Sequence, residues 1–168
     1  MPVSIDDFRA VMSHWASGVT VITARHGEQM HGMVATSFCS VSTDPVTVLF
    51  CADHRTRTYP VVKGAGAFAV NILSEGQEDT FRVFAGWKGE RDADKFASEE
   101  TITATTGAPI LKQCLGWLDC RVVAAYPGGN THTIFVGEVV GAGAGVDRPP
   151  LVYYHRHVRH FTEDDPEE

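Results

Sequence analysis

Three segments rich in β-branched and aromatic residues follow one another between residues 18 and 52, and only short turns separate them. The segments are GVTVITA (18–24), MHGMVATSFCSV (30–41) and VTVLFCA (46–52). Their content of Val, Thr and Phe is typical of β-strands, and turn signals lie at His26–Gly27 and at Asp44–Pro45. A parallel sheet would need crossover helices between such strands. The order of the segments therefore favours a mainly β fold whose strands follow one another through turns.

The remaining patterned segments extend this sheet and add short helices. Ser4 and Asp7 form a capping signal, and Ile5, Phe8, Met12 and Trp15 then recur at helical spacing. We expect further helices over 56–63 and 75–86, and further strands over 67–73, 116–126, 132–140 and 150–161. Six or seven strands with two or three short helices indicate a closed β-barrel. A chain of 168 residues is expected to form one domain, over 1–162, with an acidic, disordered tail over 163–168.

The charge distribution argues against nucleic acid as a partner. The chain has 14 basic and 21 acidic residues, a net charge of −7, but five of the acids lie in the last six residues. The body is therefore nearly neutral and lacks the basic excess that drives binding to DNA or RNA. No run approaches the roughly 18 apolar residues of a membrane span, and MPVSIDDFRA is unlike a signal peptide. We expect a cytoplasmic protein that binds neither nucleic acid nor membrane.

Neither the cysteines nor the C-terminal histidines show a typical metal-binding pattern. The four cysteines, at positions 39, 51, 114 and 120, have no zinc-site spacing and are interpreted as buried thiols. A metal at His155, His157 and His160 is the alternative, since the first two share a strand face. Imidazoles that alternate with arginines are more typical of a solvated or dimer-facing strand. We therefore expect no metal site.

Two polar clusters at strand ends are candidate binding residues. Thr36, Ser37 and Ser40 place hydroxyls at the edge of an apolar strand, where small side chains would let a flat ring lie against the backbone. DHRTRT (53–58) follows an apolar strand and opens a helix, so its hydroxyls, guanidinium groups and N-terminal amides suit a phosphate. The alternative is a solvated loop in which Thr56 caps the helix.

Motifs that the chain lacks narrow the chemistry further. There is no G-x-G-x-x-G, no P-loop and no G-x-S-x-G, so a Rossmann site, a P-loop site and a serine hydrolase are unsupported. His132 follows the turn glycines Gly128 and Gly129 at the start of a strand, and a lone histidine there is more often structural or merely exposed.

The residues also carry a resemblance that extends from about Phe8 to Phe161. The succession FRAVMSHWASGVTVIT, GMVATSFCSVSTDPVTVLFC, HRTRTYP, FAVNIL, GAPIL, HTIFVGEV and PLVYYHRHVRHF resembles the flavin reductase family. The resemblance implies the FMN-binding split β-barrel, a Greek-key fold, as a homodimer. It also implies hydride transfer from NADH or NADPH to FMN or FAD, which often supplies the oxygenase of a two-component monooxygenase.

Carried over by position, the resemblance implies a set of site residues. The isoalloxazine and ribityl chain would lie along Val34, Ala35, Thr36 and Ser37, and along Cys51, Ala52 and Asp53. The flavin phosphate would be held by Thr56, Arg57 and Thr58, and the cofactor would be bordered by Phe84 and Ala85. The nicotinamide would lie near His132, Tyr154 and Arg156. The family has Gly-Asp before this histidine, whereas this chain has Asn130 and Thr131, which leaves the choice between NADH and NADPH open.

The implied reaction asks the protein to position two rings, because the cofactors carry the chemistry. His132 would then orient the nicotinamide or pair with its charge rather than act as a nucleophile. The alternative function is a non-catalytic flavin-binding protein, a sensor or store on the same barrel. Trp15 and Trp117 are expected in the core or at a subunit interface, and the polar segment 87–106 is expected to form a loop over the site.

Overall fold

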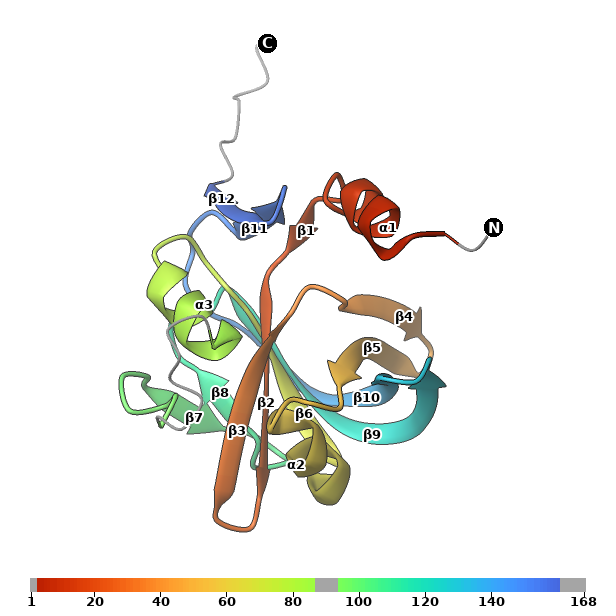
Figure 1. Ribbon diagram of the computed structural model, residues 1–168. Helices are drawn as coiled ribbons and strands as arrows, with labels where there is room; N and C mark the ends of the chain where they lie inside the picture. The colour runs from red at the N-terminus through yellow and green to blue at the C-terminus, as the bar shows by residue number, and fades with distance from the viewer. Residues whose placement is uncertain (1–2, 87–93, 161–168) are drawn as a thin grey trace.

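A curved antiparallel sheet of seven strands organises the protein (Figure 1). The computed structural model describes residues 3–86 and 94–160 of the 168-residue chain. The elements in chain order are α1 (Ile5–Met12), β1 (Ser17–Gly18), β2 (Thr20–His26), β3 (Gln29–Ala35), β4 (Cys39–Thr43), β5 (Val46–Asp53), α2 (Thr58–Ala65), β6 (Ala67–Ile72), α3 (Glu78–Ala85), β7 (Thr101–Thr103), β8 (Pro109–Leu111), β9 (Gly116–Gly128), β10 (His132–Ala144), β11 (Leu151–Tyr154) and β12 (His157–His160). This confirms the predicted mainly β fold with a few short helices.

The large sheet has the strand order β3-β2-β6-β9-β10-β5-β4. Strand β3, at one edge, also contacts β5, which lies next to the opposite edge, so the sheet curls back on itself. Two small sheets, β1-β11-β12 and β7-β8, accompany it. In Figure 1, α1 lies beside the sheet formed by β1, β11 and β12, at one end of the molecule.

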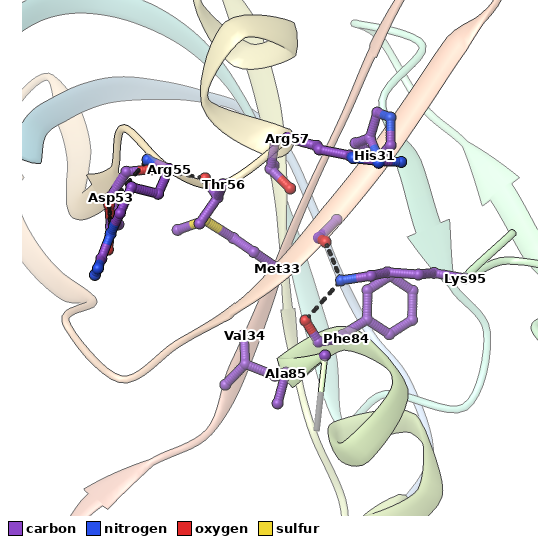
Figure 2. A pocket seen from close by; sticks show the side chains of 13 residues that line it. His31, Met33, Val34, Asp53, Arg55, Thr56, Arg57, Phe84, Ala85 and Lys95 are labelled. Carbon is purple, nitrogen blue, oxygen red and sulfur yellow. Dashed lines mark hydrogen bonds and ion pairs between the residues drawn. The ribbon is translucent and has the colours of Figure 1, made fainter. Parts of the chain in front are cut away.

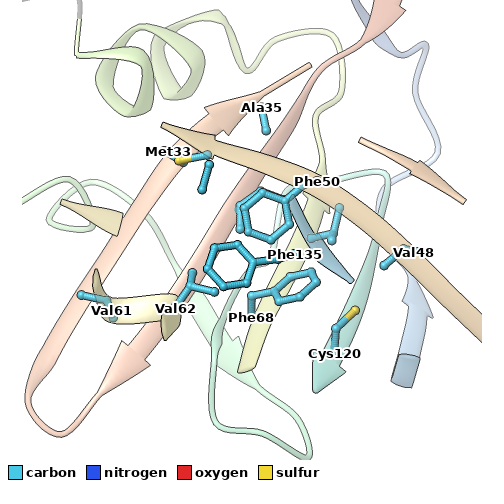
Figure 3. Close-up of a cluster of buried hydrophobic side chains, with 13 residues drawn as sticks. Met33, Ala35, Val48, Phe50, Val61, Val62, Phe68, Cys120 and Phe135 are labelled. Atoms are coloured by element: carbon cyan, nitrogen blue, oxygen red, sulfur yellow. The ribbon is translucent and has the colours of Figure 1, made fainter. Parts of the chain in front are cut away.

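Aromatic residues from three strands fill the barrel (Figure 3). The ring of Phe50 on β5 packs edge-on against Phe68 on β6 and stacks on Phe135 on β10, with centroids 4.8 and 5.5 Å apart. All three side chains are almost completely buried. Such aromatic pairs prefer offset or edge-to-face packing, which these rings adopt. The packing of these rings therefore holds β5, β6 and β10 together inside the barrel.

The predicted strand over 30–41 is two strands on opposite edges of the sheet. Strand β3 pairs with β2 and ends at Ala35, whereas β4 begins at Cys39 and pairs with β5. Between them, the Ser37 hydroxyl donates to the Cys51 carbonyl at 3.3 Å and accepts from the Cys51 N–H at 3.2 Å. A side chain thus takes the place of backbone pairing where the chain crosses from one edge to the other.

Other expectations need correction at the surface. The C-terminal segment 150–161 forms the hairpin β11–β12, and the predicted loop over 87–106 contains β7 in its described part. Cys114 and Cys120 are buried as predicted, but Cys39 on the edge strand β4 is exposed and Cys51 is partly exposed. Helix α1 begins at the predicted cap, since the Ser4 hydroxyl accepts from Asp7 N–H. None of its residues is buried, however, and Trp15 is 70% exposed, so Trp15 does not pack in the core.

The tail over 163–168 lies outside the described residues. Within the described ranges, no helix is long and apolar enough to cross a membrane. In the same ranges, no group of three or more His, Cys, Asp or Glu side chains is arranged to hold a metal, and His160 instead lies 2.7 Å from Glu75.

We expect the Phe50→Ala substitution to lower the free energy of unfolding by about 3–5 kcal/mol, because it leaves a cavity between two packed rings. Urea unfolding at neutral pH measures this change. Val46→Ala is the control on the same strand, since Val46 is 51% exposed, and it should change stability by less than about 1 kcal/mol. Equal effects of the two substitutions would contradict the role assigned to the aromatic cluster.

Candidate functional site

A cavity of about 670 Å³ opens where β3, the β5–α2 turn and the end of α3 meet (Figure 2). We call it the β3–α3 cavity. Its walls are formed by residues 31–34, by Asp53 and residues 55–58, by residues 84–86, and by Lys95. Segments far apart in sequence therefore converge on one concave surface that mixes apolar and cationic side chains.

The β5–α2 turn is held rigid by its own side chains. The Asp53 carboxylate accepts hydrogen bonds from Arg55, including the backbone N–H at 2.9 Å and Nη2 at 2.6 Å. These bonds lower the pKa of Asp53 to about 2. The Thr56 hydroxyl donates to the Asp53 carbonyl at 2.8 Å and accepts from the Tyr59 N–H at 3.3 Å. Thr56 thus caps the start of α2, as the alternative interpretation of this turn expected, and presents the following residues to the cavity.

Lys95 is a half-buried cation at the opposite side of the cavity. Its ammonium group donates to the Phe84 carbonyl at 3.0 Å and to the Gly32 carbonyl at 3.4 Å, and it lies 5.9 Å from the Phe84 ring centroid. Burial and the nearby charge of Arg57 lower the pKa of Lys95. Within the part of the chain that the structure describes, no carboxylate forms an ion pair with Lys95. Its two partners are neutral carbonyl groups.

His31 joins Arg57 and Lys95 in the same part of the cavity, and Figure 2 shows the side chain of Arg57 running toward it. Burial, followed by the charges of Arg57 and Lys95, lowers the pKa of His31. Burial takes water away from the charged imidazolium, and the two neighbouring positive charges repel the added proton, so both effects favour the neutral ring. The only carboxylate among the described lining residues is Asp53, which is bonded to Arg55. The cavity therefore favours an anionic ligand.

Gly32 explains how two carbonyl groups come within reach of Lys95. A Cβ at this position would lie 2.5 Å from the Phe84 ring, so only glycine lets β3 approach α3 this closely. The Gly32 and Phe84 carbonyls then lie on the same side of the cavity and receive the ammonium group. Lys95 and His31 were not predicted as site residues. The one signal for Lys95 was its place in the polar segment 87–106, which was expected to lie over a site.

A second cavity, of about 580 Å³, lies between α1, the β3–β4 connection and the β11–β12 hairpin. We call it the α1 cavity. Phe8, Met12 and Trp15 line it from the helix side, and Thr36 and Ser37 line it from the end of β3. Because Val34 lines the β3–α3 cavity and Thr36 lines the α1 cavity, the end of β3 forms a wall between the two.

A third cavity, of about 280 Å³, lies beside the start of β10. We call it the β10 cavity. His132 lies here, directly opposite Asp53 in the pairing of β10 with β5, and its charge contributes to lowering the pKa of Asp53. The His132 Nδ1 lies 2.9 Å from the Thr131 hydroxyl, and the His54 Nε2 lies 2.9 Å from the Thr133 hydroxyl.

The structure distributes the predicted site residues over these cavities. Those lining the β3–α3 cavity are Val34, Asp53, Thr56, Arg57, Thr58, Phe84 and Ala85. Those lining the α1 cavity are Thr36, Ser37 and Arg156, and His132 lines the β10 cavity. The side chains of Ala35 and Ala52 are buried in the barrel core, and Cys51 is partly exposed. Tyr154 lies against His155, with ring centroids 4.3 Å apart, and lines none of the three cavities.

Comparisons with known proteins identify the family of this chain. The model of the flavin reductase like domain matches residues 12–162, so the chain belongs to this family. The reductase component of 4-hydroxyphenylacetate 3-monooxygenase from Thermus thermophilus is 42% identical over 155 residues, covering 92% of this chain and 95% of the relative. The protein named FMN reductase (NADH) RutF 2 from Rhizobium rhizogenes is 33% identical over 150 residues, covering 89% of this chain and 85% of the relative.

A solved structure supports the same assignment at the level of the fold. The NADH:FAD oxidoreductase SgcE6 from Streptomyces globisporus C-1027 matches with a TM-score of 0.87 at 31% identity, covering 98% of this chain and 99% of that chain. The curled antiparallel sheet described above is thus the expected split barrel.

We expect Asp53→Asn to destabilise the protein by no more than about 1 kcal/mol at pH 7, because solvent screens the exposed guanidinium of Arg55. The folded-state pKa of Asp53 is lowered, so this stabilisation is present above the unfolded-state pKa near 4 and is lost as the pH falls toward 2. Urea unfolding at several pH values should show the difference from wild type shrinking below pH 4. Asp79→Asn, which removes an exposed pair with Arg82, is the control, and a pH-independent difference for Asp53→Asn would refute the assignment.

Proposed function

We propose that the protein is an NAD(P)H-dependent flavin reductase that supplies reduced FMN or FAD to a partner monooxygenase. One observation carries the proposal: a cation-lined cavity adjoins the apolar end of β3, whose other side opens into a second cavity. FMN and FAD have a planar ring at one end and phosphate farther along the molecule. The ring would suit the apolar end of β3, and the phosphate would suit the cation-lined cavity. The relatives named as flavin reductases and as a monooxygenase reductase component support the same function.

The residues present fit a flavin phosphate on the chemistry of the β3–α3 cavity. Lys95, Arg57 and the amides at the start of α2 would bind its oxygens, because phosphate accepts charge-assisted hydrogen bonds and favours a helix N-terminus. Burial and then neighbouring positive charge lower the pKa values of Lys95 and His31, and the phosphate would offset that charge. Thr58, the first residue of α2, would add a hydroxyl, whereas the Thr56 hydroxyl already bonds to the turn.

From this anchor, the ring would lie along Val34, Ala35, Thr36 and Ser37. Ala35 and Ala52 direct their side chains into the core, so their contribution to the cofactor wall would come from backbone groups. The Ser37 hydroxyl holds the β3–β4 connection to Cys51, which keeps this wall in place. When bound, the flavin accepts a hydride from the nicotinamide, and the chain contributes by holding the two rings in contact. His132, Tyr154 and Arg156 would serve the nicotinamide side.

The assembly that we propose is a homodimer in the cytoplasm. Helix α1 exposes a row of apolar side chains, and Ile5 and Val11 on it lie outside the α1 cavity at 68% and 70% exposure. An exposed apolar row of this kind is typical of a protein interface. All four cysteines are free, which suits a reducing compartment.

A non-catalytic flavin-binding protein would use the same cation-lined cavity, so reduction is the deciding test. We expect the flavin's visible absorbance to bleach when NADH or NADPH is mixed with the protein and FMN or FAD under anaerobic conditions. Gel filtration should then separate reduced flavin from the protein, as supply to an oxygenase requires. Flavin binding without bleaching by either nicotinamide would leave the non-catalytic alternative.

We also expect Lys95→Met to raise the Kd for FMN about tenfold, because a hydrogen bond to a charged group is lost. The Kd for riboflavin, which has no phosphate, should stay at its wild-type value. Titrations followed by flavin fluorescence measure both constants. Lys112→Met is the control, since Lys112 pairs with Glu100 and lines none of the described cavities. Equal weakening of FMN and riboflavin would show that Lys95 does not act on the phosphate.

A further inference from the structure

The two-residue turn of the β11–β12 hairpin has an unusual backbone. Tyr154 pairs with His157, so His155 and Arg156 form the whole connection. Both have positive φ, 50° and 62°, and within the described ranges they are the only non-glycine residues that do. Tight hairpin turns with two left-handed residues strongly prefer Asn-Gly or Asp-Gly, because other side chains are strained there. Such strain persists at functional sites when the surrounding structure enforces it.

The two residues that follow helix α1 supply the enforcing contacts. The His155 N–H donates to the Ser13 carbonyl at 2.9 Å, just beyond the last residue of α1. The His155 ring lies edge-on against His14, with centroids 4.5 Å apart. On the other side of the turn, the His157 Nδ1 lies 2.6 Å from the His155 carbonyl. The turn is therefore fixed between the helix and its own hairpin, and Arg156 has a defined place relative to α1.

That place is the wall of the α1 cavity, which Arg156 lines together with Arg9. None of the described residues that line this cavity carries a carboxylate. In the described part of the chain Arg156 makes no ion pair, and Arg9 makes only a long contact of 3.9 Å to Asp6. The rings of Trp15, Phe8 and Tyr153 line the same cavity. Guanidinium groups beside aromatic rings suit a nucleotide that carries phosphate groups.

We propose that Arg156 is a specificity-determining residue that binds the diphosphate of the nicotinamide dinucleotide in the α1 cavity. This inference rests on the proposed function, in which the flavin phosphate occupies the β3–α3 cavity. The end of β3 borders both cavities, so a nicotinamide ring that reaches it from the α1 cavity would leave the diphosphate on the side of Arg156. The planar guanidinium fork binds phosphate oxygens in pairs, which explains why a strained arginine stands where glycine would be relaxed.

The test uses Arg156→Asn, because asparagine tolerates left-handed backbone and removes the charge. We expect the KM for the preferred nicotinamide dinucleotide to rise about tenfold, whereas kcat and the Kd for FMN should keep their wild-type values and the melting temperature should not fall. Reduction by N-benzyl-1,4-dihydronicotinamide, a hydride donor without phosphate, should keep its wild-type rate. Arg156→Lys should give an intermediate KM, since it keeps the charge and loses the fork.

Arg159→Gln is the matched control. Arg159 lies on the same hairpin as Arg156, but it lines none of the described cavities. An unchanged dinucleotide KM in Arg156→Asn would overturn the proposal. So would an equal loss with the phosphate-free donor, which would place Arg156 at the ring. A weakened Kd for FAD with an unchanged dinucleotide KM would assign the cavity to the adenylate of FAD instead. If none of the hydride donors reduces flavin in the presence of the wild-type protein, the proposed function itself fails. That result is distinct from a failure of the proposal for Arg156.

Discussion

The packing of three phenylalanine rings inside the barrel is the interaction on which the rest of the structure depends. Phe50 and Phe135 face each other in the pairing of β5 with β10, and they lie three residues from Asp53 and His132, respectively. The core therefore determines where the polar strand ends come out at the rim. A shift of one residue in this pairing would exchange the buried and exposed faces of one of the two strands. The β5–α2 turn and the start of β10 thus meet because the rings beneath them pack in one register.

Positive charge at the rim is maintained at an energetic cost. Lys95 is half-buried against two carbonyl groups, and its pKa and that of His31 are both lowered by burial and by the nearby charge of Arg57. Burial of like charges destabilises a folded protein unless a ligand or partner compensates for it. The strained turn at His155 and Arg156 adds a second local cost on the far side of β3. Both costs fall at cavities, which is where functional sites concentrate such features.

Some site residues were predictable because their signals are local. The DHRTRT segment follows an apolar strand and precedes a helix, so its position at a strand end was evident, and Arg57 and Thr58 do line the cavity. Lys95 was missed because its partners, Gly32 and Phe84, lie far from it in sequence and meet only through the packing of β3 on α3. Thr56 carried two possible roles, and the structure uses its hydroxyl to cap α2. The crossing at Ser37 was also hidden, because it depends on Cys51 in another strand.

The sequence by itself determined the β-rich elements, the capped first helix and the lack of a basic excess, since periodicity, capping and charge can be read without knowing which distant segments meet. The order of its motifs also determined the family. Only the tertiary structure decided that the end of β3 divides two cavities, that Lys95 joins Arg57, and that α1 holds Arg156 in a left-handed turn. These features depend on which distant segments pack together, and that choice is made by the whole core rather than by any local pattern.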